Sequence, residues 1–199
     1  MGKIFCVIGK SSSGKDTIYQ KLIEQREIEL RRMIPYTTRP IRSGEQEGRE
    51  YHFVSVEALE RLEREHKVIE RRDYHTIHGV WSYFTVDDGQ MDVTCHNYIM
   101  IATLEAYQNM KAYFGEAVMC PIYVEVEDGE RLQRALVRER QQQQPRYAEM
   151  CRRFLADCED FSEKKLSCAR IVRRFENKDI QSTYRQIMDY IKGEVVSGN

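Results

Sequence analysis

The stretch that decides the fold is IFCVIGKSSSGKDT, which runs from Ile4 to Thr17. Its five leading apolar residues, Ile4–Ile8, predict a buried strand. The residues that follow fit the pattern G-x-x-x-x-G-K, in which backbone N–H groups surround a phosphate. Gly9 and Gly14 let the backbone turn tightly, and a helix that begins near Gly14 directs its positive end at the same anion. A strand, a phosphate-binding loop and a helix in this order predict a nucleotide-binding α/β fold.

The loop also predicts the ligand and the side chains that hold it. Lys15 would place its charge beside the β- and γ-phosphates of ATP or GTP. Asp16 departs from the motif, because a Ser or Thr usually follows the lysine and ligates Mg²⁺. A carboxylate is also a good Mg²⁺ ligand, so we expect Asp16 to hold the metal directly or through water. The alternative is a strand-to-helix turn without a ligand. The expected nucleotide site comprises Gly9, Ser11, Ser12, Ser13, Gly14, Lys15, Asp16 and Thr17.

The bulk composition narrows the class of protein. With 199 residues, 41% apolar and 32% charged, the chain has the make-up of one globular domain. Its 31 basic and 32 acidic residues give a net charge of −1. This balance argues against a general nucleic-acid or membrane binder, but it allows a local basic cleft for phosphates. Without a membrane-spanning run or a signal peptide, we expect a cytoplasmic protein, either a monomer or a homodimer.

The six cysteines include no C-x-x-C pair. We therefore expect free thiols, with Cys6 and Cys120 packed in the core because they lie in or near predicted strands. A zinc site is a further hypothesis, although the spacing of its members matches no standard ligand pattern. Those members would be His75, His78, Cys95 and His96.

Hydrophobic periodicity predicts strands that alternate with helices. Strands are expected at 4–8, 33–34, 50–54, 98–102, 122–126 and 169–175, with one or more short strands over 68–84. Helices are expected at 15–29, 56–66, 104–114, 128–141, 147–165 and 179–192. This alternation predicts a parallel sheet covered by helices on both faces.

One domain over 1–199 is expected to have three parts. The core would consist of 1–33, 89–127 and 166–199. Residues 34–88 break the alternation and predict a small mixed-β insertion beside the phosphate loop, where a second substrate would bind. Residues 128–165 would form a helical lid with its flanking helices.

A second motif lies in the insertion, in TTRPIRSGE at 37–45 and GREYHFVS at 48–55. Arg39 and Arg42 are three residues apart, and Tyr51 follows nine residues later. Arginines offer fixed, paired donors and tyrosine a directional hydroxyl, so the group suits a phosphate monoester. Taken alone, a loop with two arginines is more often solvated surface.

The two motifs together resemble the guanylate kinase family, which transfers the γ-phosphate of ATP to GMP. The tight match is confined to the N-terminal third, and the later elements correspond in general order. The resemblance implies a three-layer P-loop α/β/α fold, with ATP and Mg²⁺ as cofactors and a nucleoside monophosphate as the acceptor.

The resemblance also implies roles for individual residues. Arg39, Arg42 and Tyr51 would hold the acceptor phosphate, and Glu45 matches a position at the acceptor site. Glu70 resembles the glutamate that reads guanine through its N1–H and amino group. Taken alone, Glu70 would be an exposed strand carboxylate.

Arginines of the predicted lid would close on the transferring phosphoryl group and offset its charge. Arg138 and Arg153 match this role, Arg134 lies on the same helix face as Arg138, and Arg140 is a rival for that position. Asn177 resembles a residue near adenine, and it could equally belong to a helix N-terminal turn. The expected catalytic residues are Lys15, Arg39, Arg138 and Arg153.

Three departures from the family pattern concern the base and the metal. Pro35 stands where a base-contacting serine is usual, and 80–83 replace a Y-G-[ST] segment. The strand that usually ends in D-x-D reads Ile101-Ala102-Thr103. A guanine site discriminates through such polar partners. The sequence therefore indicates the type of reaction more firmly than it indicates the base of the acceptor.

Two alternatives to a GMP kinase follow. One is a catalytically inactive binding module of the same fold, although such a module has no physical need for Lys15 and both loop glycines. The other is a kinase for another phosphorylated small molecule, in which Glu70 has a different role.

Overall fold

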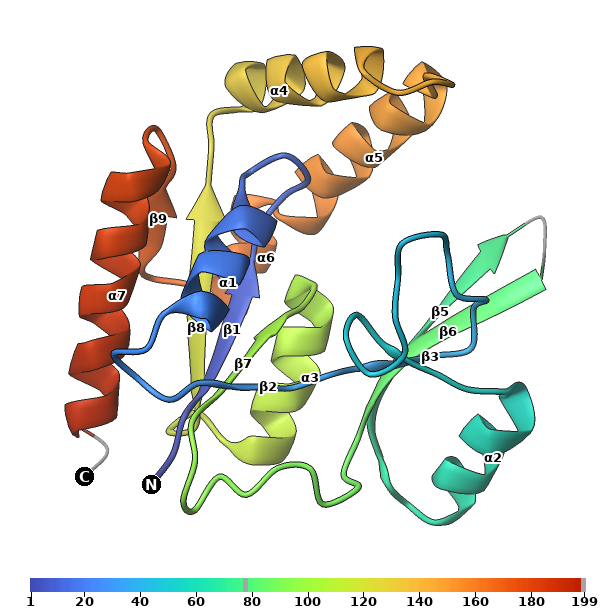
Figure 1. The fold of residues 1–199 in the computed structure, drawn as a ribbon, viewed down its shortest axis with the longest axis vertical. Helices are drawn as coiled ribbons and strands as arrows, with labels where there is room; N and C mark the ends of the chain where they lie inside the picture. Colours follow the sequence, from blue (N-terminus) through green and yellow to red (C-terminus); the bar gives the residue numbers. More distant parts are fainter. Residues whose placement is uncertain (77–78, 198–199) are drawn as a thin grey trace.

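The computed structural model describes residues 1–76 and 79–197. Within these residues, five parallel strands form the core sheet (Figure 1). Their order is β2 (Arg31–Arg32), β7 (Tyr98–Ile101), β1 (Ile4–Ile8), β8 (Met119–Glu125) and β9 (Arg174–Glu176). The parallel register holds across every neighbouring pair, and the predicted P-loop α/β fold is confirmed.

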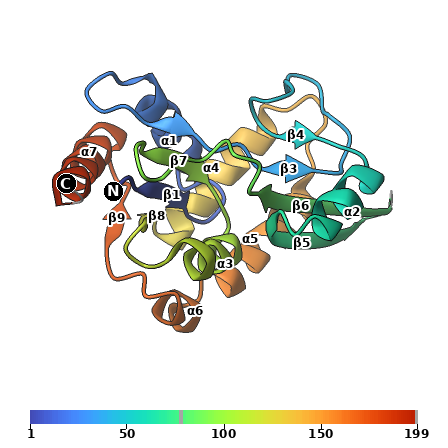
Figure 2. The same cartoon turned by 90° about the horizontal axis from the view of Figure 1, so that it is seen from below.

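Helices cover both faces of this sheet (Figure 2). One face carries α1 (Lys15–Glu24) and α7 (Ile180–Ser197), and the other carries α3 (Leu104–Phe114) and α6 (Glu163–Cys168). Side chains alternate along a strand, so β1 divides its residues between the two cores. Phe5 and Val7 pack with α1 and α7 residues. The opposite cluster contains Ile4, Cys6 and Ile8 together with α3 and α6 residues such as Leu104 and Leu166.

A second, mixed sheet lies between β2 and β7 in the chain. Its order is β4 (His52–Phe53), β3 (Tyr36–Thr37), β6 (Gly79–Val86) and β5 (Val68–Thr76). β3 pairs parallel with β4 and antiparallel with β6, which in turn pairs antiparallel with β5. The helix α2 (Val56–Arg64) packs on this sheet through Leu59, which joins a small core of its own. Ser55 begins α2 as predicted, with its hydroxyl accepting from the Ala58 N–H.

The helices α4 (Asp128–Arg140) and α5 (Tyr147–Asp160) extend over the carboxyl end of the core sheet (Figure 1). The loop between β1 and α1 lies beneath them. Among the described residues, no helix combines the length and apolar character needed to cross a bilayer.

Several predicted boundaries differ from the structure. The first helix ends at Glu24 because the Gln25 side chain accepts from the Glu27 and Ile28 N–H groups and closes a turn. The helix expected over 147–165 divides at Phe161, which turns inward and stacks on Tyr123 at 5.7 Å. The last strand covers only 174–176, and the second lies at 31–32 rather than 33–34.

The cysteines are free thiols, as predicted. Cys6 and Cys120 are buried in the core, and burial raises the pKa of Cys120 to about 11.

Candidate active site

The phosphate-binding loop has the close packing that its glycines predict. Gly14 has a φ of +86°, and a Cβ there would lie 2.4 Å from the Asn177 amide nitrogen. A Cβ on Gly9 would lie 2.5 Å from the Val124 carbonyl oxygen. Both positions therefore exclude larger residues. Ser12 has a φ of +64° without being glycine, so the loop carries some backbone strain.

Two hydroxyl groups of this loop are buried without a partner. The Ser12 and Ser13 Oγ atoms make no hydrogen bond with any described residue, and Ser13 is only 1% exposed. Burial of an unpaired hydroxyl costs free energy. No described side chain caps the first turn of α1 either, so its N–H groups are free for an anion. These features fit a polyphosphate chain in the loop.

Lys15 and Asp16 lie at the start of α1, beside the loop. The Lys15 Nζ atom lies 3.3 Å from the Asp16 carboxylate, which is 74% exposed. Among the described residues, no three His, Cys, Asp or Glu side chains gather into a metal site, so His75, Cys95 and His96 do not come together as the zinc hypothesis expects. His78 of the zinc hypothesis lies outside the described residues. Mg²⁺ typically needs only one or two carboxylates when phosphates supply the other ligands, and Asp16 fits that requirement.

Asn177 packs against the phosphate-binding loop and holds its backbone in place. This buried residue donates from its side-chain amide to the Ser13 carbonyl oxygen at 2.8 Å. Its own backbone N–H donates to the carbonyl of Glu125 at 2.8 Å, and Arg134 donates to its backbone carbonyl at 3.2 Å. Asn177 therefore fixes the loop conformation, while its predicted contact with adenine stays a prediction.

A network of charges that the sequence analysis missed connects the loop to α4 and α5. Arg131, 1% exposed, contacts Asp128 at 3.0 Å and Asp157 at 3.3 Å. Asp157 also accepts from the Ser11 N–H at 2.8 Å, and Lys10 pairs with Asp128 at 3.0 Å. The guanidinium of Arg131 additionally stacks over an aromatic ring of α5 at 3.9 Å. The loop is thus held to α4 and α5 through ion pairs around the buried Arg131.

The predicted lid arginines lie at different distances from the loop. Arg153 donates to the Ser11 hydroxyl at 3.4 Å, so α5 brings it to the loop. Arg134 reaches Glu130 and the Asn177 carbonyl. Arg138 is exposed one turn further along α4, and with Arg134 it lines an open cavity of about 310 Å³. Arg140 is exposed as well.

The predicted acceptor-phosphate residues gather in the insertion. The buried Arg39 forms a two-point ion pair with Glu45 at 2.6 and 2.7 Å, and its Nε donates to the Tyr83 hydroxyl at 3.1 Å. The Tyr51 ring lies against its guanidinium at 5.1 Å. Hydrogen bonds from Arg39 lower the pKa of Glu45. Arg42 is exposed, and its side chain makes no hydrogen bond within the described chain. Glu45 thus orients Arg39, while Arg42 is free for a ligand.

Glu70 is buried rather than exposed on its strand. Its carboxylate pairs with Arg72 at 2.8 Å and accepts from the Thr85 hydroxyl at 2.8 Å. Arg72 also donates to the Thr103 hydroxyl, at the carboxyl end of β7, at 3.1 Å. This contact joins the insertion to the edge of the core sheet from which the phosphate loop emerges.

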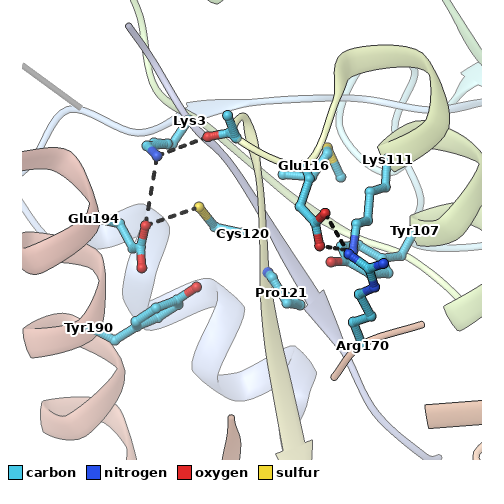
Figure 3. A pocket seen from close by; sticks show the side chains of 11 residues that line it. Lys3, Tyr107, Lys111, Glu116, Cys120, Pro121, Arg170, Tyr190 and Glu194 are labelled. Carbon is cyan, nitrogen blue, oxygen red and sulfur yellow. Dashed lines mark hydrogen bonds and ion pairs between the residues drawn. The ribbon is translucent and has the colours of Figure 1, made fainter. Parts of the chain in front are cut away.

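A second cavity, of about 310 Å³, lies at the opposite edge of the sheet (Figure 3). Lys3 and Cys120 line it near the amino ends of β1 and β8. Its charges pair with one another, since Lys3 lies 3.7 Å from Glu194, and Lys111 and Arg170 both bind Glu116. It therefore takes no part in the site around the phosphate loop.

Comparisons with known proteins agree with this geometry. The family model described as guanylate kinase matches residues 1–194. Proteins named guanylate kinase from Cupriavidus metallidurans and Dechloromonas aromatica are 38% and 39% identical over 74 residues, or 37% of this chain. The match spans about a third of their length, 34% and 36% respectively. The crystal structure of guanylate kinase from Anaplasma phagocytophilum superposes with a TM-score of 0.66 at 20% identity, covering 97% of this chain and 86% of that one.

Proposed function

The chain belongs to the guanylate kinase family, and on this premise we propose that it transfers the γ-phosphate of ATP to GMP or a related nucleoside monophosphate, with Mg²⁺. The observation that carries the proposal is the loop with a buried, unpartnered Ser13 hydroxyl and the adjacent Lys15. The cluster of Arg39, Glu45, Tyr51 and Tyr83, called the Arg39 cluster, would supply the second half of the site. The contact between Arg72 and Thr103 docks the insertion at the same edge of the sheet.

Catalysis in this site rests on position and charge. Lys15 would neutralise the β- and γ-phosphates, while Arg42 and Tyr51 hold the acceptor phosphate with the pre-oriented Arg39. Arg153 would approach the transferring group from α5 and stabilise the charge on its oxygens. Neither a covalent intermediate nor a strong general base is required. Closure of α4 and α5 over the loop would exclude water and limit ATP hydrolysis.

Asp16 is the residue that would hold Mg²⁺, and the ion would supply charge neutralisation between the phosphate oxygens. Replacement of Asp16 by Asn keeps the size of the side chain and removes its charge. We expect the Mg²⁺ concentration for half-maximal activity to rise by about tenfold. Asp189→Asn, which alters an exposed carboxylate on α7, serves as the control. Identical Mg²⁺ titrations for Asp16→Asn and the parent protein would exclude Asp16 from metal binding.

A second candidate is a kinase for another phosphorylated small molecule. The observation in its favour is the ion pair between Glu70 and Arg72, which neutralises the carboxylate expected to read guanine. The phosphate-binding groups are unaffected by this pair, so the reaction type would be the same.

The acceptor is tested by coupled ADP production with ATP and Mg²⁺ across the nucleoside and deoxynucleoside monophosphates and simple sugar phosphates. We expect turnover with at least one monophosphate. Turnover on GMP or another nucleoside monophosphate supports the first proposal, and turnover on a sugar phosphate alone supports the second candidate. ATP binding without turnover on any acceptor would contradict both proposals.

A further inference from the structure

Arg72 occupies the position where the acceptor's distinguishing group would be read. We propose that Arg72 determines acceptor specificity, by turning this part of the site from a hydrogen-bond acceptor into a hydrogen-bond donor. The preferred acceptor would then present an oxygen atom, either a carbonyl or an anionic oxygen, where guanine presents N–H groups. This inference rests on the proposed phosphotransferase function, because it concerns the second substrate of that reaction.

The first support is that the Glu70 carboxylate is already paired and lies completely buried. Its Oε1 atom accepts from the Thr85 hydroxyl at 2.8 Å and from Arg72 Nη2 at 3.2 Å, and its Oε2 atom accepts from Arg72 Nε at 2.8 Å. The Glu70 side chain is 0% exposed. A guanine edge would have to displace a buried, charge-assisted pair to reach it, which is costly.

The second support is the unused donor capacity of Arg72. A guanidinium carries five N–H groups, and three of them are occupied by Glu70 and Thr103. The two remaining N–H groups have no partner among the described residues, and the side chain is 12% exposed. The polar groups still available to a ligand here are therefore donors.

The third support is the location of Arg72 beside the predicted phosphate-binding residues. Burial raises the pKa of Tyr51, and the positive charges of Arg39 and Arg72 both oppose that rise. In the pairing of β5 with β6, Arg72 lies opposite Tyr83, whose hydroxyl accepts from Arg39 and whose ring packs against Tyr51. Its bond to Thr103 also fixes it at the end of β7, where the sequence reads Ile101-Ala102-Thr103 without a carboxylate.

Guanine would meet this arrangement with the wrong polarity. In the orientation expected for reading by Glu70, guanine would turn its N1–H and amino group toward arginine N–H donors, and unpaired buried polar groups are strongly discriminated against. Only a rotated base would offer its O6 and N7 acceptors to Arg72. Two kinds of acceptor satisfy the donors instead. One is a pyrimidine monophosphate with a carbonyl at this edge, and the other is a sugar phosphate with a second anionic group.

The test compares acceptors in the full chain and in Arg72→Met. UMP and dTMP form the carbonyl arm, fructose 1,6-bisphosphate forms the anionic arm, and GMP is the reference. We expect the parent protein to favour an oxygen-presenting acceptor over GMP in kcat/KM. Arg72→Met should lower kcat/KM for that acceptor by about 30-fold or more and reduce or invert the ratio to GMP.

Arg71→Met is the matched control, because Arg71 is the neighbouring residue on β5 and pairs with Glu63 and Asp73 instead. Arg71→Met should leave unchanged the ratio of kcat/KM for the oxygen-presenting acceptor to kcat/KM for GMP. Arg72→Met could unfold the insertion by leaving Glu70 unpaired, so the double variant E70Q/R72M provides a second measurement without a buried charge. Its acceptor ratio should also move toward GMP.

The outcomes separate this inference from the proposed function. If the parent protein phosphorylates no acceptor, the proposed phosphotransferase function is contradicted. The inference about Arg72 is then decided by binding, measured as the rise in melting temperature that UMP, dTMP, fructose 1,6-bisphosphate and GMP each produce. A parent protein that favours GMP, in turnover or in binding, overturns the inference. So does the absence of any preference, or an equal effect of Arg72→Met on all acceptors, which would indicate a purely structural role.

Discussion

Lys15→Ala is expected to lower kcat/KM for phosphoryl transfer by about a thousandfold, with little change in folding. The Nζ atom of Lys15 is the cation that the motif places beside the β- and γ-phosphates. Removal of one charge-stabilising donor from a phosphoryl- or acyl-transfer site typically costs about 10²–10³-fold in rate. We expect the upper end of this range, because Lys15 also contributes to ATP binding.

The measurement is coupled ADP production with the acceptor found for the parent protein, together with thermal unfolding of the parent, of Lys15→Ala and of a control variant. Lys21→Ala alters another lysine of α1 and should retain near-full activity. Among described residues, the exposed Asp16 carboxylate is the only hydrogen-bond or ion-pair partner of the Lys15 side chain, so the melting temperature should stay close to that of the parent. Lys15→Ala with more than a tenth of the parent activity would contradict the role assigned to this loop.

Arg131→Met is expected to produce the largest loss of stability. The side chain is buried between Asp128 and Asp157 and lies over the Phe154 ring at 3.9 Å. Methionine fills similar space but leaves the Asp157 carboxylate without its cation. Breaking a buried pair in this way costs about 3–5 kcal/mol. Asp128 keeps Lys10 as a partner and is partly exposed, so we expect about 3 kcal/mol, the lower end of that range.

Urea unfolding of the full chain gives the free energy of unfolding directly. Arg134→Met is the control, because Arg134 lies on the same helix and pairs with Glu130 at the surface. The two side chains are 31% and 52% exposed, respectively. Such a pair should contribute less than about 1 kcal/mol. Equal losses for Arg131→Met and Arg134→Met would mean that the buried network does not hold the lid to the loop.

The parts of this protein that follow from the sequence are the local ones. The apolar run of β1, the spacing of Gly9 and Gly14, and Lys15 together specify a strand, a loop and a helix within a short stretch, and the structure confirms that architecture. The cap at Ser55 is another local signal, since its hydroxyl and the Ala58 N–H lie three residues apart.

The parts that the sequence did not reveal depend on contacts between distant segments. α4 carries arginines at 131, 134, 138 and 140, and helical spacing alone cannot tell which face is buried. The buried face proves to consist of Arg131, Ala135 and Glu139, four residues apart, and Arg131 is specified by partners on α5. Asp128 and Arg131, three apart on one helix, were the available sequence signal for this pair.

The spacing of Glu70 and Arg72 in the sequence already indicated that their side chains could pair. Residues two apart in a strand share one face, and opposite charges in that arrangement can pair. What the sequence could not show is the depth at which they are buried. That depth depends on the partner strand, which places Thr85 opposite Glu70, and on Thr103 at the end of a strand in the other sheet.

The phosphate loop and the Arg39 cluster are together expected to transfer a phosphoryl group from ATP to the phosphate of an acceptor. The most direct measurement is ³¹P NMR of the protein with ATP, Mg²⁺ and a mixture of nucleoside monophosphates and sugar phosphates. We expect ADP to accumulate together with an equal amount of a newly phosphorylated acceptor, and little free phosphate. Release of inorganic phosphate that is independent of the acceptors, or no consumption of ATP at all, would contradict the claim.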